Sequence, residues 1–232
     1  MGKLILDSNS DNFKVFSNHL ESKIYLDGII WRSVAQYYQT QKFESFQKRK
    51  EIIFSKNALE AEKIGTEKYI EPKGFWKKLK QAKNNPKFKE NWKELRYSVL
   101  KKGIKAKILQ NYSTRKTLFE TKNKILLAKV ESTFWGYEKN GENNLGKIFM
   151  EIRSELTQNG PFDEMKNKML PPWIKYPNIP GFSLFWKMGE GEHYNLTFTF
   201  WYHGLSPENQ CKYKNEYPPL KNDSWIYVYD KK

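Results

Sequence analysis

With 232 residues, of which 38% are hydrophobic and 16% aromatic, the chain has the composition of a globular protein, not a disordered one, and it is long enough for one core with or without a small appendage. Lysine and arginine outnumber aspartate and glutamate by 41 to 26, which gives a net charge of +15 and favours partners that carry phosphate, although a solvated lysine-rich surface explains the charge equally well. The single cysteine, Cys211, excludes a disulfide framework and a thiolate zinc site within the chain, and it fits a reducing cytoplasm.

The first predicted elements are a hairpin and a helix. The segment KIYLDGIIW places apolar residues on both sides of Asp27-Gly28, a dipeptide typical of tight hairpins, so a small sheet is expected to open the fold. Ser33 can cap a helix that runs to Phe43. A period of 3.6 residues then places Ala35, Gln39 and Lys42 on one face.

Further helices are predicted along the chain. Residues 57–64 follow a capping-box spacing and end at Gly65. A longer helix runs from Asn91 to Asn111, and Gly103 in its middle is expected to cost about 1 kcal/mol relative to alanine. The clearest amphipathic pattern covers residues 145–156, before the terminating run Asn-Gly-Pro.

A lysine-rich and aromatic segment lies between two of these helices. Residues 73–93, KGFWKKLKQAKNNPKFKENWK, contain a single acid, Glu90. Lysines neutralise phosphate and aromatic rings stack on bases, so this segment is the predicted nucleic-acid patch. The residues assigned to it are Lys73, Trp76, Lys77, Lys78, Lys80 and Lys83.

The composition changes after Pro161. The stretches HYNLTFTFWYHG and DSWIYVYD alternate in the manner of strands. We therefore expect an α+β fold in which residues 1–160 form a helix-dominated domain with a small β-sheet, and residues 161–232 form a β-rich, aromatic C-terminal extension packed on it. This extension would cover a cleft or enlarge a binding surface.

Several common functional signatures are missing. The start of the chain does not resemble a targeting sequence, and no apolar run approaches the roughly 18 residues of a membrane span, so we expect a cytoplasmic protein without a membrane partner. Motifs of P-loop, Rossmann, zincin and α/β-hydrolase proteins are not found. His193 and His203 are expected to be structural, and neither a cofactor nor a metal is predicted.

One loop is a candidate phosphate site. The segment FWGYEKNGENNLG, residues 134–146, precedes the helix at 145–156 and can direct backbone N–H groups at an anion. Asn143 and Gly146 are its candidate contacts. Ordinary helix capping is the alternative explanation of the asparagines.

Several motifs together resemble a known family. The string SVAQYYQTQKF, residues 33–43, is similar to S-V-E-H-Y-Y-Q-A-Q-K-F, and Phe16-Ser17-Asn18 is similar to F-S-N. Ala106, Lys107 and Gln110 then match an L-x-x-A-L-x-A-K-F-x-Q stretch, and residues 135–153 match W-G … G-x-N-x-L-G … M-E-x-R. These motifs belong to the NADAR (YbiA-like) family, and the resemblance spans about residues 12–158 in the correct order.

The resemblance implies N-glycosidase chemistry. Some members of the family hydrolyse intermediates of riboflavin synthesis, and others remove ADP-ribose from guanine in DNA, often beside a DarT-type toxin. The implied ligand-binding residues are Phe16, Ser17, Asn18, Gln39, Trp135, Gly136, Asn143 and Gly146.

The chain departs from the family pattern at two positions. Ala35 stands where the motif has its glutamate, and Ser132 stands where an aspartate is usual, with Glu131 beside it. Cleavage of a ribosyl C–N bond passes through an oxocarbenium-like state that a carboxylate stabilises. Glu131 is a substitute acid, and Lys42, about two helical turns from Ala35, can attack an opened ribose as an amine. The alanine fits either a substitution that retains bound substrate or a binding-only protein.

The charge and the lysine-rich segment favour removal of ADP-ribose from a base in nucleic acid, with guanine in DNA as the expected substrate and ADP-ribose or ADP-ribosylated nucleic acid as the partner. One alternative is hydrolysis of a small phosphoribosylamine of riboflavin synthesis. The other is a non-catalytic module that binds ADP-ribose or a related nucleotide.

Overall fold

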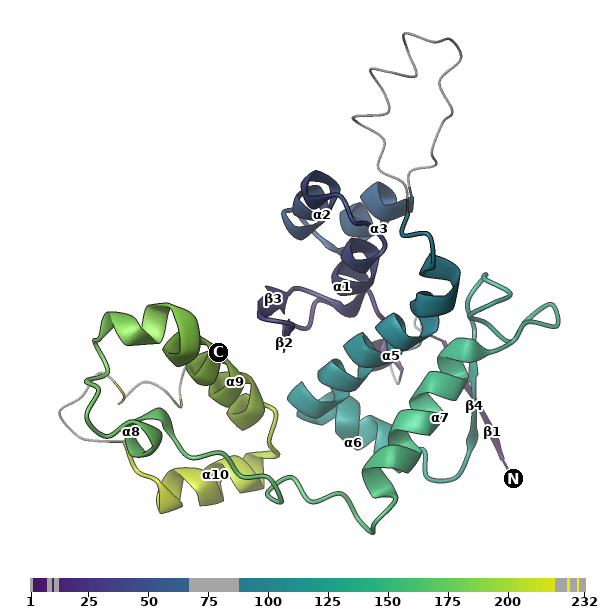
Figure 1. Cartoon of the computed structure of the whole chain (residues 1–232). Coiled ribbons are helices and arrows are strands. Elements are labelled where there is room, and N and C mark those ends of the chain that lie inside the picture. Colours follow the sequence, from purple (N-terminus) through teal and green to yellow (C-terminus); the bar gives the residue numbers. More distant parts are fainter. Residues whose placement is uncertain are drawn as a thin grey trace, which may run out of the picture.

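The computed structural model describes residues 2–7, 10, 13–66, 88–219, 225 and 229, and Figure 1 shows the course of the chain. Its described strands form two small sheets. Strand β1 (Lys3–Leu6) pairs in parallel with β4 (Ile125–Ala128), and β2 (Ile24–Leu26) pairs antiparallel with β3 (Ile29–Trp31). Together with the helices, these sheets confirm the predicted α+β class.

The hairpin turn has the predicted conformation. Asp27 and Gly28 have φ angles of 55° and 77°, in the left-handed region that a two-residue turn between twisted strands requires. Ile24 and Trp31, paired across the hairpin, are both buried. The hairpin therefore presents one apolar face to the core.

Three helices follow the hairpin: α1 (Val34–Gln41), α2 (Phe46–Ile53) and α3 (Ala58–Thr66). The predicted cap of α1 is confirmed, since the Ser33 hydroxyl accepts a hydrogen bond from the Gln36 N–H at 3.1 Å. Asn57 likewise accepts from the Glu60 N–H at 2.9 Å at the start of α3. Helix α2 was not predicted.

The long helix α5 (Trp92–Gln110) crosses the core beside α1. A β-carbon on Gly103 would lie 3.0 Å from Tyr37 Cδ1, so glycine permits the close approach of the two helices. The predicted end of this helix at Asn111 is confirmed, because Asn111 is the C-terminal cap of α5. Asn111 also begins a helix that was not predicted, α6 (Tyr112–Glu120), by accepting a hydrogen bond from the Thr114 N–H at 3.0 Å.

Helix α7 (Asn144–Thr157) confirms the amphipathic pattern predicted for residues 145–156. Its buried face packs against β4 and α5, and the short 3-10 helix η1 (Lys14–Phe16) closes the same core. The shared apolar core consists of Leu6, Phe16, Ile24, Trp31, Val34, Tyr37, Leu100, Ile104, Ala106, Ile108, Leu118, Leu126, Ile148, Phe149 and Ile152.

The predicted β-rich C-terminal extension is wrong for the residues that the structure describes. They form α8 (Pro172–Lys175), the 3-10 helix η2 (Leu184–Lys187), α9 (Gly189–His203) and α10 (Pro207–Glu216). The stretch HYNLTFTFWYHG lies almost entirely in α9. Most of the second predicted strand, residues 223–230, lies outside the described residues.

The alternation in α9 comes from two apolar helix faces. Phe198 and Tyr202, four residues apart, are buried in an aromatic cluster with α8, η2 and α10. His193 and Phe200, seven residues apart, contact Tyr25 of β2, and the Tyr25 hydroxyl lies 2.7 Å from His193 Nδ1. Because α9 packs one face against the aromatic cluster and another against Tyr25, its sequence alternates in a way that is typical of a strand.

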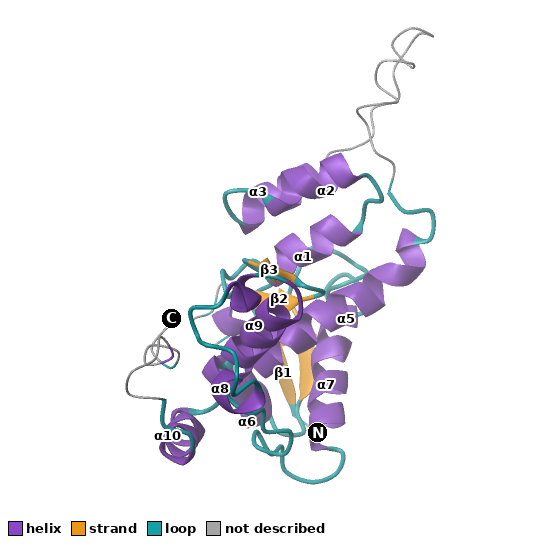
Figure 2. Cartoon of the chain, turned by 60° about the vertical axis from the view of Figure 1, so that its left-hand side comes forward, coloured by secondary structure: helices purple, strands orange, loops and turns teal. Residues whose placement is uncertain are grey.

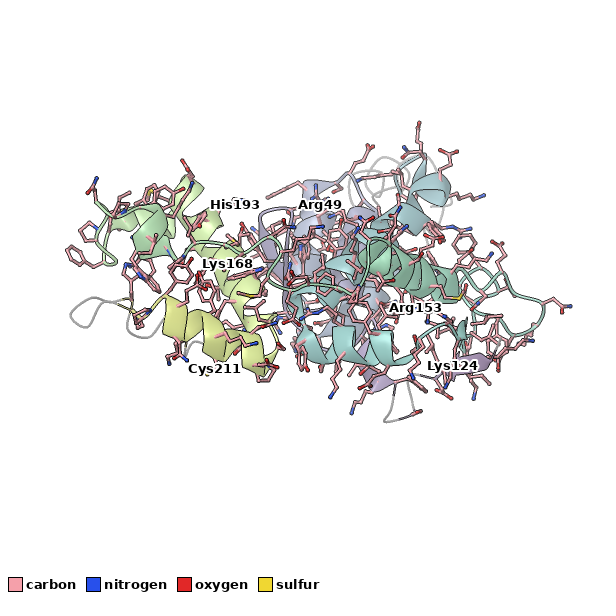
Figure 3. All side chains as sticks on the ribbon, turned by 90° about the horizontal axis from the view of Figure 1, so that it is seen from below. Arg49, Lys124, Arg153, Lys168, His193 and Cys211 are labelled. Carbon is pink, nitrogen blue, oxygen red and sulfur yellow. The ribbon has the colours of Figure 1, made fainter. Side chains whose placement is uncertain are left out.

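The helices α8, α9 and α10 form a group beside the first core, joined to it through α9 (Figures 1 and 2). Figure 3 shows Lys168, His193 and Cys211 in this group and Lys124 and Arg153 toward the opposite end of the molecule. The division into domains at residue 160 stays a prediction. Within the described residues, no helix combines the length and apolarity needed to cross a membrane.

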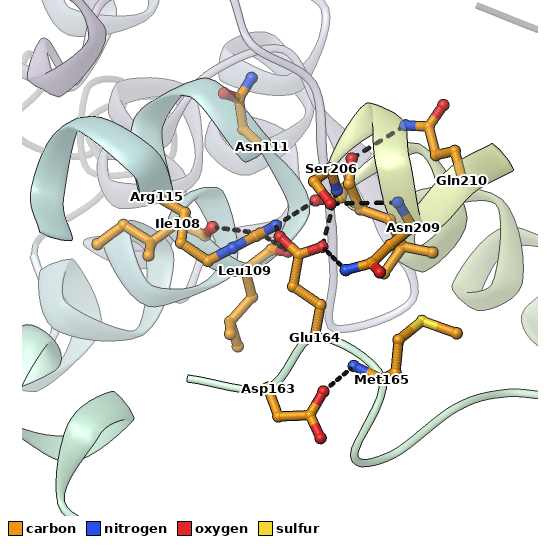
Figure 4. A network of polar contacts seen from close by, with 12 residues as sticks. Ile108, Leu109, Asn111, Arg115, Asp163, Glu164, Met165, Ser206, Asn209 and Gln210 are labelled. Atoms are coloured by element: carbon orange, nitrogen blue, oxygen red, sulfur yellow. Dashed lines mark hydrogen bonds and ion pairs between the residues drawn. The ribbon is translucent and has the colours of Figure 1, made fainter. Parts of the chain in front are cut away.

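A buried ion pair reinforces the junction of the two groups (Figure 4). Arg115 of α6 contacts Glu164 at 2.5 Å and donates to the Gly204 carbonyl at 2.6 Å. The other oxygen of Glu164 accepts from the Ser206 N–H at 2.8 Å, at the start of α10. A single carboxylate therefore neutralises Arg115 and binds Ser206, the residue that caps α10.

Candidate functional site

A cavity of about 540 Å³ opens between α1, α3, α5, the turn after η1 and the loop after β4. It brings together five of the residues predicted for the site: Asn18, Ala35, Gln39, Glu131 and Trp135. Its other lining residues are His19, Tyr38, Glu62, Leu100, Val130, Ser132 and Leu145.

Helix α1 supplies one wall of the cavity. Ala35, Tyr38 and Gln39 are separated by three and four residues, so they share the face that lines it. The Ala35 N–H donates to the Asn18 carbonyl at 2.9 Å, which fixes the turn after η1 against α1. A β-carbon on Gly65 would lie 2.3 Å from Gln39 Oε1, so glycine in α3 makes room for the glutamine side chain.

Two buried amide oxygens of the cavity residues lack a hydrogen-bond partner within the part of the chain that the structure describes. Among the described residues, nothing donates a hydrogen bond to Asn18 Oδ1 or to Gln39 Oε1. An unsatisfied buried acceptor costs about 1–3 kcal/mol, so such atoms are typical of places where a ligand supplies the donor. Hydroxyl groups of ribose and N–H groups of a base are donors of this kind.

Aromatic rings form another wall. Trp135 meets the Tyr38 ring edge-on, with centroids 6.0 Å apart, and Tyr38 also contacts Trp92 at 5.1 Å. Burial raises the pKa of Tyr38 to about 12, so its hydroxyl is neutral at physiological pH. The half-buried Trp135 gives the cavity a ring on which a planar base can stack.

Glu62 and His19, which were not predicted for the site, form an ion pair at the cavity. His19 Nε2 lies 2.8 Å from Glu62 Oε2, and the two side chains are 40% and 42% exposed. The hydrogen bond between them lowers the pKa of Glu62 and raises that of His19 against the opposing effect of burial. His19 directly follows the F-S-N motif, whereas Glu62 is part of no motif.

Lys42 lies next to the cavity and not in its lining. Its ammonium group donates to the Gly65 carbonyl at 3.3 Å and sits 5.4 Å from the centre of the Tyr38 ring. Burial lowers the pKa of Lys42 to about 8, although Glu62 opposes that shift. A fraction of this amine is therefore unprotonated near neutral pH.

A second buried lysine holds the turn that carries Asn18. Lys107 of α5 donates to the Ser17 carbonyl at 2.8 Å, and burial lowers its pKa to about 7. Phe16 packs on Phe149 of α7 with ring centroids 4.8 Å apart. Phe16 and Ser17 line a smaller neighbouring cavity, so the structure places them behind the larger one.

The glycine- and asparagine-rich loop is bound tightly to β4. Asn143 accepts a hydrogen bond from the Ala128 N–H and donates one to the Leu126 carbonyl, both at 2.9 Å. A β-carbon on Gly146 would lie 2.2 Å from that carbonyl oxygen, and one on Gly136 would lie 2.3 Å from the Val130 oxygen. These residues shape the loop, and their contact with a ligand stays a prediction.

The predicted nucleic-acid patch lies outside the described residues, because residues 67–87 contain all six of its assigned side chains: Lys73, Trp76, Lys77, Lys78, Lys80 and Lys83. Trp92, at the end of the same lysine-rich segment, is described and contacts Tyr38 of the cavity wall. In the described ranges, no group of three acidic, histidine or cysteine side chains is arranged to hold a metal ion.

Comparison with known proteins finds relatives of the part of the chain that contains the cavity. The model of the NADAR domain family matches residues 6–157. N-glycosidase YbiA of Shigella flexneri is 29% identical over 152 residues, 64% of this chain and 85% of that protein. A riboflavin biosynthesis protein of Vibrio vulnificus is 26% identical over 156 residues, 66% of this chain and 38% of that protein. The NMR structure of E. coli YbiA superimposes with a TM-score of 0.55 at 27% identity, covering 67% of this chain and 84% of that one.

Proposed function

Because the chain belongs to the NADAR family, we propose that it is an N-glycosidase-type ADP-ribosyl hydrolase that removes ADP-ribose from a modified base of nucleic acid, guanine in DNA in the first place. One observation carries the proposal: an aromatic cavity lies beside a desolvated lysine and contains two amide oxygens to which no described residue donates a hydrogen bond. The names of the relatives support the glycosidase class.

The chemistry of the cavity fits a ribosylated base. Its volume of about 540 Å³ is in the usual range of small-molecule sites. Trp135 offers a stacking surface, and Asn18 and Gln39 offer acceptors for ribose hydroxyls or base N–H groups. The net charge of +15 favours a polynucleotide substrate over a small one. A DarT-type toxin would be the source of the modification.

Lys42 supplies a covalent route for the reaction. Opening of the ribose breaks the C1″–O4″ bond, the unprotonated amine adds to C1″, and the C1″–N bond to the base breaks. One amine proton goes to O4″, and the other leaves with the base, which takes the electron pair of the broken bond. The resulting lysine imine is hydrolysed by water, which regenerates the amine and releases ADP-ribose. A pKa of about 8 makes this amine available near neutral pH.

Two other functions are tested by the same experiments. Hydrolysis of a small phosphoribosylamine is favoured by the relatives that are named as riboflavin biosynthesis proteins. Binding of ADP-ribose or a related nucleotide without turnover is favoured by Ala35, which places a methyl group in the cavity wall where the family motif has a carboxylate.

The deciding experiment measures release of ADP-ribose from guanine-ADP-ribosylated DNA by this chain and by its Ala35→Glu variant, with Lys42→Ala introduced into each. Release by either form that is lost without Lys42 supports the proposal, and affinity for the DNA should fall steeply with added salt. If neither form acts on this DNA but a phosphoribosylamine is hydrolysed, the small-substrate function replaces it. Binding without turnover in both forms leaves the nucleotide-binding module.

A further inference from the structure

The cavity has a carboxylate that the family motif does not supply. Position 35 carries a methyl group, yet Glu62 of α3 lines the same cavity as Ala35. We infer that Glu62, held in place by His19, performs the proton transfer that the side chain at position 35 does not provide. This inference rests on the proposed N-glycosidase function and names a further catalytic residue for it.

The geometry keeps Glu62 accessible while holding it in place. Its Oε2 atom is fixed by His19 at 2.8 Å, and its side chain remains 42% exposed. Among the contacts of the described residues, none engages Oε1. One carboxylate oxygen is thus anchored, and the other is available to a water molecule or a ribose hydroxyl in the cavity.

The charges around Glu62 keep it in the ionised form, which is the form that can accept a proton. The hydrogen bond from His19 and the positive charge of Lys42 lower the pKa of Glu62 against burial, so the carboxylate is ionised. Glu62 and the Gly65 carbonyl that accepts the Lys42 hydrogen bond at 3.3 Å belong to the same helix α3, so one helix carries the carboxylate and contacts the amine that we propose as the nucleophile. A carboxylate at this position can accept a proton from water and donate a proton to the nitrogen of the lysine intermediate.

The step proposed for Glu62 is the hydrolysis of the lysine imine. Glu62 takes one proton from water as the water oxygen bonds to C1″, and it passes that proton to the Lys42 nitrogen, which gives a carbinolamine. Glu62 then carries the hydroxyl proton of the carbinolamine to the same nitrogen as the C1″–N bond to lysine breaks, so that the water oxygen becomes the aldehyde oxygen. The net change is addition of water to the imine, which yields the free amine and the aldehyde of ADP-ribose. His19 takes no part in the covalent change and acts as a positioning residue.

Glu131 is the competing carboxylate in the cavity. It lies on the loop after β4, where its side chain is exposed, and the structure gives it no ion pair with another described residue. Glu62 projects from a helix and is held by a partner 43 residues away in sequence. A fixed carboxylate is the better base, because its position costs no reordering at the moment of reaction.

The test compares single-turnover release of ADP-ribose by the unaltered chain and by Glu62→Gln, Glu131→Gln and His19→Ala, with His19→Gln as the conservative variant. Glu120→Gln is the matched control, since this exposed carboxylate lies on α6, 3.9 Å from Lys116. We expect at least a hundredfold loss with Glu62→Gln and accumulation of a lysine adduct that borohydride traps. Activity lost in His19→Ala should return in His19→Gln, which can still donate to Glu62.

The outcomes separate this inference from the proposed function. Turnover by the unaltered chain that Glu62→Gln leaves intact overturns the inference and keeps the function. An inactive chain that gains turnover only as Ala35→Glu also overturns it, because Glu62 then does not replace the missing carboxylate. Failure of both the unaltered chain and Ala35→Glu to cleave any ribosylated base or ribosylamine removes the proposed function itself.

Discussion

Replacing Glu164 by alanine should destabilise the junction between α6 and the C-terminal helices. Arg115 and Glu164 are only 4% and 11% exposed, so the pair is held away from water. Removing the carboxylate leaves the guanidinium buried with backbone carbonyls as its remaining partners, at distances between 2.6 and 3.2 Å. The substitution also removes the acceptor of the Ser206 N–H at the start of α10.

Breaking a buried ion pair from one side costs about 3–5 kcal/mol, because the remaining charge keeps its desolvation penalty. The loss should depend on pH. Burial alone would raise the pKa of Glu164, but hydrogen bonds from Ser206, Asn209 and Arg115 outweigh it and lower the pKa below its usual 4.5. The carboxylate therefore stabilises the fold above about pH 4.5, and its contribution disappears as the pH falls through the lowered value.

Urea denaturation followed by tryptophan fluorescence measures this loss, since Trp173 and Trp186 lie in the C-terminal aromatic cluster. Glu208→Gln is the matched control, because Glu208 lies in the first turn of the same helix α10 but forms an exposed pair with Lys212. If Glu164→Ala lowers the free energy of unfolding no more than this control does, the buried pair does not stabilise the junction. If the difference in free energy of unfolding between the unaltered chain and Glu164→Ala is the same at pH 3 as at neutral pH, the electrostatic explanation is contradicted.

Three further predictions concern α1 and its neighbours. Gly103→Ala should lower the midpoint of urea denaturation, because the added Cβ would lie 3.0 Å from Tyr37 Cδ1. This effect opposes the helix propensity of alanine, which is about 1 kcal/mol better than that of glycine. A higher midpoint would contradict the prediction. Gly65→Ala should weaken the binding of ADP-ribose measured by calorimetry, because the added Cβ would lie 2.3 Å from Gln39 Oε1 and displace the Gln39 side chain. An unchanged affinity would exclude Gln39 as a ligand contact. An NMR titration of the lysine ε-methylene signals should show Lys42 deprotonating near pH 8, because burial disfavours its charge, and a midpoint near 10.5 would show that the amine is solvated.

Local patterns predicted most of the first core correctly. Asp27-Gly28 specifies its turn through backbone conformation alone, and Ser33 begins α1 through a hydrogen bond to a residue three positions away. Such signals are contained within a few residues, so they can be read without the fold. Strand β4 carried no comparable signal, since it is defined by parallel pairing with β1, more than a hundred residues earlier.

The C-terminal region shows where period alone is insufficient. Alternating aromatic residues are typical of a strand, but α9 uses Phe198 and Tyr202 on one face and His193 and Phe200 on another. The helix becomes apolar on both faces because it lies between the aromatic cluster and Tyr25. The alternating pattern becomes compatible with a helix only when Tyr25 is known to be the second contact of α9. Tyr25 lies 168 residues from His193 in the sequence, so local analysis does not include it.

The candidate site depends on both kinds of information. Ala35 and Gln39 share a helix face that the sequence predicts, and motif resemblance added Asn18 and Trp135 to the same cavity. Glu62 had no signal of its own, because its importance comes from the turn that carries His19 and from Gly65, which lets α3 approach Gln39. The absence of a carboxylate at position 35 therefore does not determine the charge of the cavity, because Glu62 of α3 places a carboxylate in the same lining. For this chain the chemistry of position 35 has to be judged together with α3.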